Sequence, residues 1–371
     1  MKLHNEDCIE QMQKMINEGV QVDSVVTDPP YELGFMGKSW DSTGIAFQKE
    51  TWELAFQLLK PGGHLLAFAG SRTYHRIAVA IEDAGFEIRD QIMWLYGSGF
   101  PKSLNVGKAV DSKKLTGKSN SVSLSKSEKN RPVVGKVKRV VSSDRVASDG
   151  EGEHGVPANM ERFHNYEQKD IPVTGPSTEE AKQWEGWGTA LKPAHEPICM
   201  ARKPISEKSV ADNVLKHGTG GINIDGCRVT TDENISNHSR SAESAVSKGI
   251  YGDSKEQETH QTQGQELGRF PANLIHDGLE EDWARFFYCP KANKKEKGDT
   301  NHPTVKPVEL MRYLVRLVTP KDGIVLDPFA GTGTTGEACI LEDRNYYLIE
   351  AEESYIKDIE NRTNRYNRLG I

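Results

Sequence analysis

The sequence predicts an α/β protein whose two ends fold together into one mostly parallel sheet, with the middle of the chain inserted between them. Apolar, strand-like runs alternate with amphipathic, helix-like segments over about the first hundred residues and again after residue 308. This alternation is typical of a parallel sheet. Neither end has enough strands for a sheet of its own. We therefore expect 1–100 and 301–371 to form one domain and 101–300 to be an insertion.

The N-terminal segment contains clear start and stop signals for helices. Asp7 is a suitable N-cap for a first helix, which Gly19 then ends. The run Pro61-Gly62-Gly63 ends the second helix in a similar way. We expect helices between Asp7 and Gly19 and at 50–59 and 73–84, and strands at 1–6, 22–27, 64–69 and 86–96.

The C-terminal segment returns to the same alternation. Pro307 precedes and Pro320 follows an amphipathic stretch, which sets the limits of a helix. We expect helices at 308–318, 334–342 and 355–366, and strands at 323–327 and 346–350. With a further apolar run at 193–204, the predicted sheet has seven strands.

Most of the middle segment lacks such periodicity. Residues 111–155 are rich in Ser, Lys and Gly and contain few large apolar groups, which predicts partial disorder. Residues 231–267 are almost wholly polar, and we expect a mobile loop there. The stretches 210–229 and 270–288 are expected to form a small compact module.

Composition excludes several classes of protein. No apolar run approaches the ~20 residues of a membrane span, and the N-terminus lacks the apolar core of a signal peptide. The five cysteines are scattered without a Cys-x-x-Cys pair, and the histidines lack metal-ligand spacing. We expect a cytoplasmic protein without a disulfide framework and without a metal site.

Charge is distributed unevenly along a chain whose formal net charge is −7. Residues 101–145 contain twelve Lys or Arg against three acids, whereas 146–190 contain nine acids against three bases. A basic, Ser-rich stretch is either a solvated linker or a segment that tracks nucleic-acid phosphates. The sequence leaves both interpretations open.

Two motifs occupy equivalent places in the predicted sheet. Asp28-Pro29-Pro30-Tyr31 directly follows the strand at 22–27, and Asp327-Pro328-Phe329-Ala330-Gly331-Thr332-Gly333 begins at the last residue of the strand at 323–327. Open α/β sheets bind ligands at these carboxyl ends. The first motif offers a carboxylate, a rigid carbonyl and an aromatic face, and the second offers a glycine turn before a helix. The spacing Gly331-x-Gly333-x-x-Gly336, followed by the acid Glu350, also fits a nicotinamide dinucleotide site.

The order of these motifs resembles that of the S-adenosylmethionine-dependent DNA amino-methyltransferases of the β group. A third segment, His302-Pro303-Thr304-Val305-Lys306-Pro307, is similar to a family segment upstream of the donor motif. The phrase at 268–277 resembles prophage-encoded members. The resemblance implies a Rossmann-like seven-stranded methyltransferase sheet in circularly permuted order. It also implies S-adenosyl-L-methionine as cofactor and double-stranded DNA as partner, with residues 101–300 recognising the target.

The resemblance also assigns roles to individual residues. Asp28 and the Pro29 carbonyl would accept the two hydrogens of an exocyclic amino group, Pro30 would stiffen the turn, and Tyr31 would stack on the flipped base. The residues assigned to the donor are Asp7, Cys8, Thr304, Lys306, Asp327, Phe329, Gly331, Gly333 and Glu350. Two alternatives remain open. Asp7 either contacts the donor's adenine or merely caps its helix, and Trp94-Leu95-Tyr96-Gly97 either lines the base pocket or closes the core.

The leading function is adenine-N6 methylation of DNA, with tight or loose sequence specificity. In the resembling family, Asp before Pro-Pro-Tyr favours adenine, but cytosine-N4 methylation is the nearest alternative. An RNA-base or glutamine-amide methyltransferase and a non-catalytic DNA-binding protein are more distant ones. Family members often dimerise, and many belong to restriction-modification systems. The sequence by itself supplies no sign of either property.

Overall fold

A computed structural model describes residues 1–34, 39–97, 103–117, 131–142, 166–230, 268–277, 287–297, 300 and 304–367. The chain divides into two compact units. The first combines Met1–Gly97 with His195–Ile371, and the second is Ser98–Ala194. The unit formed by the middle of the chain therefore ends near residue 194, because the segment after it returns to the main sheet. The expected loop at 231–267 lies outside the described residues.

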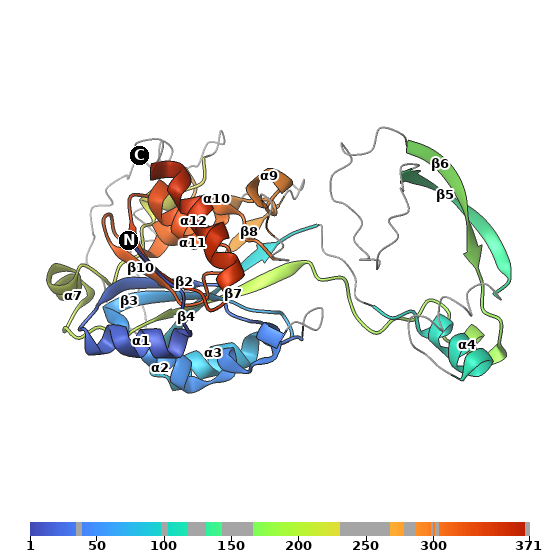
Figure 1. Ribbon diagram of the computed structural model, residues 1–371, viewed down its shortest axis with the longest axis horizontal. Helices are drawn as coiled ribbons and strands as arrows, with labels where there is room; N and C mark the ends of the chain where they lie inside the picture. Colours follow the sequence, from blue (N-terminus) through green and yellow to red (C-terminus); the bar gives the residue numbers. More distant parts are fainter. Residues whose placement is uncertain are drawn as a thin grey trace, which may run out of the picture. The chain divides into compact units, whose positions relative to one another are not determined.

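The first unit is built on a mostly parallel sheet (Figure 1). In the part of the chain that the structure describes, nine strands follow the order β1-β11-β10-β2-β3-β7-β4-β8-β9. Their bounds are β1 Lys2–His4, β2 Val22–Thr27, β3 Leu59–Phe68, β4 Glu87–Leu95, β7 His195–Arg202, β8 Leu274–His276, β9 Phe287–Tyr288, β10 Ile324–Asp327 and β11 Asn345–Ile349. Among these described strands, β7 alone runs antiparallel to its neighbours. The predicted α/β class and the seven predicted strands are confirmed.

The two remaining strands correct one prediction. Residues 210–229 and 270–288 do not form a separate module, because β8 pairs with β4 and β9 pairs with β8. Ile275, in the middle of β8, is fully buried. Joining the open edge of β4 gives this short apolar run both backbone partners and burial.

Helices cover both faces of the sheet (Figure 1). One layer contains α1 (Cys8–Asn17), α2 (Lys49–Leu58) and α3 (Tyr74–Asp83), and the other contains α10 (Val308–Val318), α11 (Thr334–Leu341) and α12 (Glu353–Asn367). Each layer has its own apolar core, with Trp52 in the first and Leu314 in the second. The remaining short elements of this unit are α7 (Val210–His217), α9 (Lys294–Lys297) and 3-10 turns at Ser39–Ser42, Ile45–Phe47 and Asp225–Cys227.

Most predicted boundaries agree with the structure to within a residue or two. Asp7 caps α1 by accepting hydrogen bonds from the backbone N–H groups of Ile9 and Glu10 at 2.8 and 3.2 Å. The start of β3 differs, because it begins at Leu59 instead of His64. Its Pro-Gly-Gly run pairs with Lys203 beyond the end of β7, at 3.1 Å from Gly62 N to Lys203 O. A Cβ at Gly63 would lie 2.8 Å from the carbonyl oxygen of Asp23. Glycine is therefore required for this close approach.

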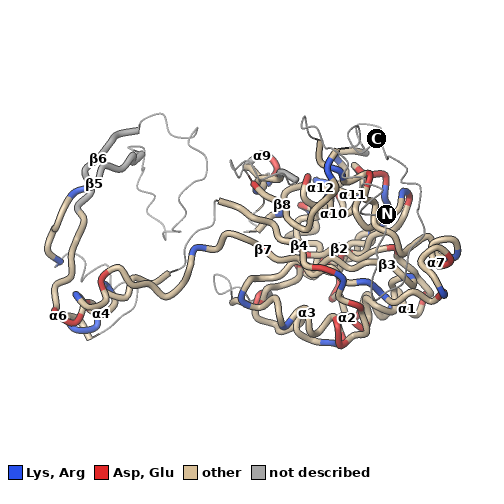
Figure 2. Tube along the Cα trace, turned by 180° about the vertical axis from the view of Figure 1, so that it is seen from behind, with Lys and Arg blue, Asp and Glu red and all other residues tan. Residues whose placement is uncertain are grey.

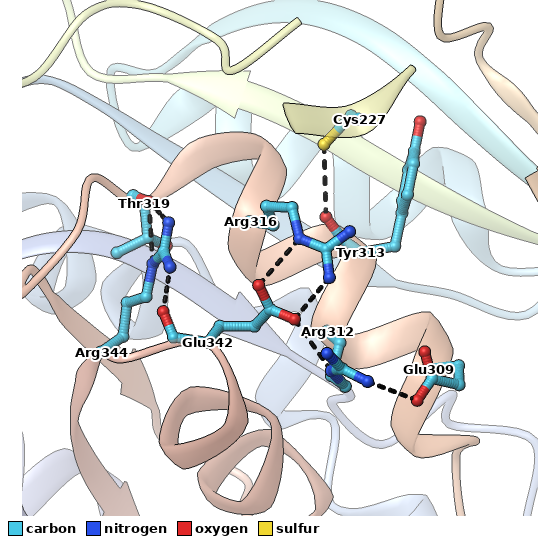
Figure 3. A network of polar contacts seen from close by, with 8 residues as sticks. All are labelled: Cys227, Glu309, Arg312, Tyr313, Arg316, Thr319, Glu342 and Arg344. Carbon is cyan, nitrogen blue, oxygen red and sulfur yellow. Dashed lines mark hydrogen bonds and ion pairs between the residues drawn. The ribbon is translucent and has the colours of Figure 1, made fainter. Parts of the chain in front are cut away.

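A polar cluster fastens α10 to the end of α11 (Figure 3). The carboxylate of Glu342 accepts hydrogen bonds of 2.8 Å from Nε of Arg312 and 2.8 Å from Nε of Arg316. Arg312 also pairs with Glu309 at 2.7 Å. Burial alone would raise the pKa of Glu342, but the two guanidinium groups outweigh it and lower that pKa. The carboxylate stays charged because both arginines hold it.

Where the structure describes the second unit, it contains two helices and a pair of antiparallel strands. Its elements are α4 (Val106–Thr116), α6 (Glu179–Gln183), β5 (Val133–Ser142) and β6 (Tyr166–Thr174). Partial disorder is expected over 111–155, and of this stretch the structure describes the end of α4 and the strand β5, whereas 118–130 and 143–155 lie outside the described residues. The β5 strand of the basic stretch pairs antiparallel with β6 of the acidic stretch.

Charges of both signs lie along α4 and α6 (Figure 2). Lys114 pairs with Glu180 across these two helices. The buried Arg131 guanidinium lies 2.8 Å from Asp111 and 2.8 Å from Glu185. The basic and acidic stretches thus neutralise part of each other's charge within the unit.

Candidate active site

The carboxyl ends of β2 and β10 bring the two sequence motifs together. The strands are parallel neighbours, with Ser24 opposite Val325 and Val25 opposite Leu326. The Thr27 hydroxyl donates a buried hydrogen bond of 2.7 Å to Oδ1 of Asp327. Residues 300 positions apart in the sequence therefore share one edge of the sheet.

Asp327 orients the glycine turn. Its Oδ1 also accepts from Phe329 N at 3.1 Å, and its Oδ2 accepts from the Thr335 hydroxyl at 2.5 Å. Burial raises the pKa of Asp327 to about 6, although these hydrogen bonds oppose the rise. The turn then passes through Gly331 and Gly333, at φ 54° and 79°. These left-handed conformations suit glycine and lead directly into α11.

Glu350 follows β11 and points at the same turn. Its Oε2 accepts a hydrogen bond of 2.7 Å from Gly331 N, and its Oε1 accepts one of 2.9 Å from Glu352 N. Burial raises its pKa to about 7. Each carboxylate oxygen can accept a second hydrogen bond. This acceptor pair beside a glycine turn fits the ribose hydroxyls of a nucleoside cofactor.

Asp28 lies just beyond β2, and its two carboxylate oxygens have different surroundings. Oδ2 forms an ion pair with the ammonium of Lys306. Among the described residues, the buried Oδ1 has no hydrogen-bond partner. Burial raises the pKa of Asp28, and the Lys306 charge counteracts it. An unpaired buried acceptor costs free energy unless a ligand satisfies it, so Oδ1 marks where a hydrogen-bond donor would bind.

Glu196, near the start of β7, was not found from the sequence. Its Oε2 accepts from the Tyr31 hydroxyl at 3.0 Å and lies 3.4 Å from Lys306 Nζ. Because β7 is antiparallel, its first residues reach the same edge as the last residues of β3. The sequence predicts the strand at 193–204 but not its direction, and no motif surrounds Glu196.

Lys306 contacts two carboxylates of the site. Its ammonium lies between Asp28 and Glu196, and its predicted contact with the donor's carboxylate stays a prediction. Burial alone would lower the pKa of Lys306, but these two carboxylates outweigh it and raise that pKa. The ammonium also lies 4.7 Å from the Phe68 ring centroid and 5.3 Å from that of Tyr31. Lys306 thus belongs to the Asp28 side of the site in this structure.

The other predicted residues are placed as follows. Asp7 caps α1, as described above, and Cys8 beside it is buried. Phe329 is partly buried against the core under α1, and Thr304 is exposed. Trp94 closes the core, where its indole N–H donates to Cys289 O at 2.9 Å. Within the described ranges, no group of three His, Cys, Asp or Glu is arranged to hold a metal ion.

Comparison with known proteins decides the family. A family profile described as DNA methylase, N6_N4_Mtase, matches residues 22–361. The chain belongs to this family. S-adenosyl-L-methionine is the methyl donor that the family uses, and the glycine turn with Glu350 fits it. The predicted family is therefore confirmed, and the nicotinamide alternative does not apply.

Individual relatives are more distant. The type II methyltransferase M.HindIII of Haemophilus influenzae is 25% identical over 327 residues, which are 87% of this chain and 68% of that protein. M2.MboI of Moraxella bovis is 44% identical over 68 residues, which are 18% of this chain and 25% of that protein. The chain thus spans a quarter of M2.MboI and about two thirds of M.HindIII.

Similarity to solved structures is weak at the level of sequence. The crystal structure of the M1.HpyAVI–SAM complex aligns with a TM-score of 0.46 and 17% identity over 98% of both chains. The cytosine-N4-specific PvuII DNA methyltransferase aligns with a TM-score of 0.46 and 14% identity over 99% of this chain and 92% of that one. In the described part of this chain, no helix has the length and apolar character needed to span a bilayer.

Proposed function

We propose that this protein transfers a methyl group from S-adenosyl-L-methionine to the N6 amino group of an adenine flipped out of double-stranded DNA. The observation that carries the proposal is the buried Oδ1 of Asp28, which has no hydrogen-bond partner in the described part of the chain and lies beside Tyr31, one strand away from the glycine turn. An amino group on a flat base supplies the hydrogen-bond donor that this oxygen lacks. Tyr31 supplies a ring on which such a base can stack, which is worth ~1–3 kcal/mol.

The residues of the site would act by orienting the amino group. Asp28 Oδ1 accepts one amino hydrogen and the Pro29 carbonyl accepts the other, so the nitrogen lone pair turns out of the ring plane toward the donor. Proline fixes φ and keeps that carbonyl steady. When bound, the sulfonium donor supplies an already activated methyl group, so positioning is the protein's main contribution. Asp28 then holds the proton that the methylated nitrogen releases.

The choice of adenine rests on the Asp28-Pro29-Pro30-Tyr31 motif, which resembles the adenine-specific pattern. The first experiment is methylation of long duplex DNA with S-adenosyl-L-methionine, followed by nucleoside mass spectrometry, with Asp28→Ala as the inactive control. N6-methyladenine supports the proposal. N4-methylcytosine would keep the reaction and overturn the base assignment. If neither nucleoside forms although the donor binds, DNA is not the substrate.

The second unit is proposed to contact DNA and help select the target. Its support is the surplus of Lys and Arg over 101–145, although part of that charge is neutralised by α6. Replacing Lys136, Lys138 and Arg139 by Gln should reduce the slope of log binding constant against log salt. The expected reduction is about 0.9 for each phosphate that the variant no longer neutralises. An unchanged slope would show that these three residues of β5 do not contact phosphates.

A further inference from the structure

We propose that Glu196 is a positioning residue of the methyl-transfer site, which holds Tyr31 and Lys306 so that one oxygen of Asp28 stays available to the target amine. This inference rests on the proposed function and adds to it a residue outside every sequence motif of the site. It depends on how three charged groups and one hydroxyl share a single, largely buried cluster of contacts.

Two carboxylates share the donors Lys306 and Tyr31. Lys306 brings one ammonium to two carboxylates, Asp28 and Glu196, and the Tyr31 hydroxyl brings one further hydrogen. Glu196 takes that hydrogen at 3.0 Å and shares the ammonium at 3.4 Å. Asp28 has the Lys306 ammonium on Oδ2 and the Tyr31 hydroxyl near enough to counteract the rise of its pKa that burial causes, while its Oδ1 has no hydrogen-bond partner among the described residues.

Removal of the Glu196 charge would leave both donors with one carboxylate. Asp28 would then be the carboxylate nearest to both Lys306 and Tyr31. Each of these donors can turn toward Oδ1, since a buried donor that loses its acceptor costs about 1–3 kcal/mol and finds another partner when one is near. Oδ1 would be occupied before a base arrives. The target amine would have to displace a bound donor, which slows transfer.

Placement of the target base depends on the Tyr31 ring. The Tyr31 ring is held at its hydroxyl by Glu196 and is covered by the Lys306 ammonium at 5.3 Å from its centroid. Tyr31 therefore has a fixed orientation before stacking. Glu196 itself is held in β7 by strand pairing, opposite Trp94 of β4. A strand residue is a more rigid anchor than a loop residue.

The test compares four forms of the full-length chain under single-turnover conditions: wild type, Glu196→Gln, Glu196→Asp and Glu87→Gln. Glu87 is the matched control, because it lies at the other end of the β4–β7 pair and contacts Arg202 instead of the site. We expect Glu196→Gln to transfer methyl groups at least tenfold more slowly. Its affinity for S-adenosylhomocysteine should stay within twofold of wild type. Glu196→Asp should recover part of the rate.

A pH profile separates positioning from a merely structural effect. The groups that face Asp28 are Lys306, Glu196 and Tyr31, with Asp327 on the neighbouring strand. The negative charge of Glu196 raises the pKa of Asp28, so Glu196→Gln should move the acid limb of the rate profile to lower pH. The carboxyl ¹³C shift of Asp28, assigned with Asp28→Asn, follows the same titration without turnover.

The outcomes distinguish this inference from the proposed function. If wild type methylates DNA and Glu196→Gln matches it in rate and in pH profile, Glu196 has no positioning role although the function stands. If wild type makes no methylated nucleoside, the proposed function fails. The ¹³C titration then still tests whether Glu196 acts on Asp28. If the pKa of Asp28 is the same in Glu196→Gln as in wild type, the positioning role of Glu196 is overturned. If Glu87→Gln loses as much of the methyl-transfer rate as Glu196→Gln, the effect is a general one on the sheet, and the positioning role of Glu196 is also overturned.

Discussion

The Thr27 hydroxyl and the Asp327 carboxylate share a buried hydrogen bond of 2.7 Å. Thr27 is the residue before Asp28, and Asp327 orients the glycine turn through Phe329 N. The bond therefore joins the part of the site that would hold the amine to the part that would hold the donor. In-line methyl transfer needs these two parts in fixed register, and neighbouring strands of one sheet supply it.

Replacing Asp28 tests the acceptor of the amine. Asp28→Ala removes the oxygen that would receive an amino hydrogen, and we expect the single-turnover rate to fall by at least about 100-fold. Affinity for S-adenosylhomocysteine, measured by calorimetry, should change little because Asp28 lies just beyond β2 and not at the glycine turn. Asp28→Asn is the size-matched companion, since it keeps one acceptor oxygen. Normal turnover in Asp28→Ala would refute the site.

Replacing Glu350 tests the donor side. At a pH above 7, where Glu350 is mostly ionised, Glu350→Ala removes a charged acceptor and leaves Gly331 N without its 2.7 Å partner. Hydrogen bonds to charged groups contribute about 1.5–3 kcal/mol, so donor affinity should fall by about 10- to 100-fold. Calorimetry with S-adenosylhomocysteine measures this loss. The exposed Glu353→Ala, one turn along, should bind normally. Equal affinities for Glu350→Ala and wild type would remove Glu350 from the ribose site.

Glu350 also makes a prediction about stability and pH. Burial raises its pKa from 4.5 to about 7, so between these values the folded protein keeps a proton that the unfolded chain has lost. The contribution of this group to stability therefore falls as pH rises from about 4.5 to about 7, by at most about 3 kcal/mol. The free energy of unfolding of Glu350→Gln, measured with urea, should increase relative to that of wild type as pH rises over that range. If the free energies of unfolding of the two proteins change equally with pH, the raised pKa of Glu350 is contradicted.

The cluster at the end of α11 offers a matched pair of substitutions (Figure 3). The Glu342 side chain is 7% exposed and holds Arg312 and Arg316, whereas Glu309 is 58% exposed and holds Arg312 alone. Glu342→Ala leaves two guanidinium groups without their shared carboxylate and should destabilise the fold by about 3–5 kcal/mol. Glu309→Ala should cost less than about 1 kcal/mol. Urea unfolding of both variants checks the difference, and similar losses would show that burial does not matter here.

Elements with strong local signals could be predicted to the residue. The bounds of β2 and α10 agree with the expectation, because prolines and a clear apolar pattern limit them. The start of β3 could not be predicted, since Pro61-Gly62-Gly63 has the composition of a turn and becomes strand through pairing with Lys203. The strands β8 and β9 contain three and two residues, too few to show a period.

In the site, too, residues with a local sequence signal could be predicted and residues placed by tertiary pairing could not. Asp28, Tyr31, Asp327 and Glu350 lie at or just after strand ends in recognisable motifs, and the sheet brings those strand ends together. Glu196 could not be predicted, because its place depends on β7 running antiparallel, which no local pattern of residues records. The partner of Lys306 depends on the same fact. Local sequence thus specifies which residues come after each strand, whereas tertiary pairing specifies which side chains meet.

The second unit leaves the sheet after β4 and returns at the start of β7, where Leu95 and His195 are paired neighbours. A segment whose two ends lie side by side can be lengthened, shortened or exchanged without moving the strands that border it. On the role proposed for the second unit, target choice and methyl transfer can then be inherited separately. A lineage could acquire a new specificity by recombination at these two positions, and Leu95 and His195 are also where an experimenter would join a foreign segment to build a chimera.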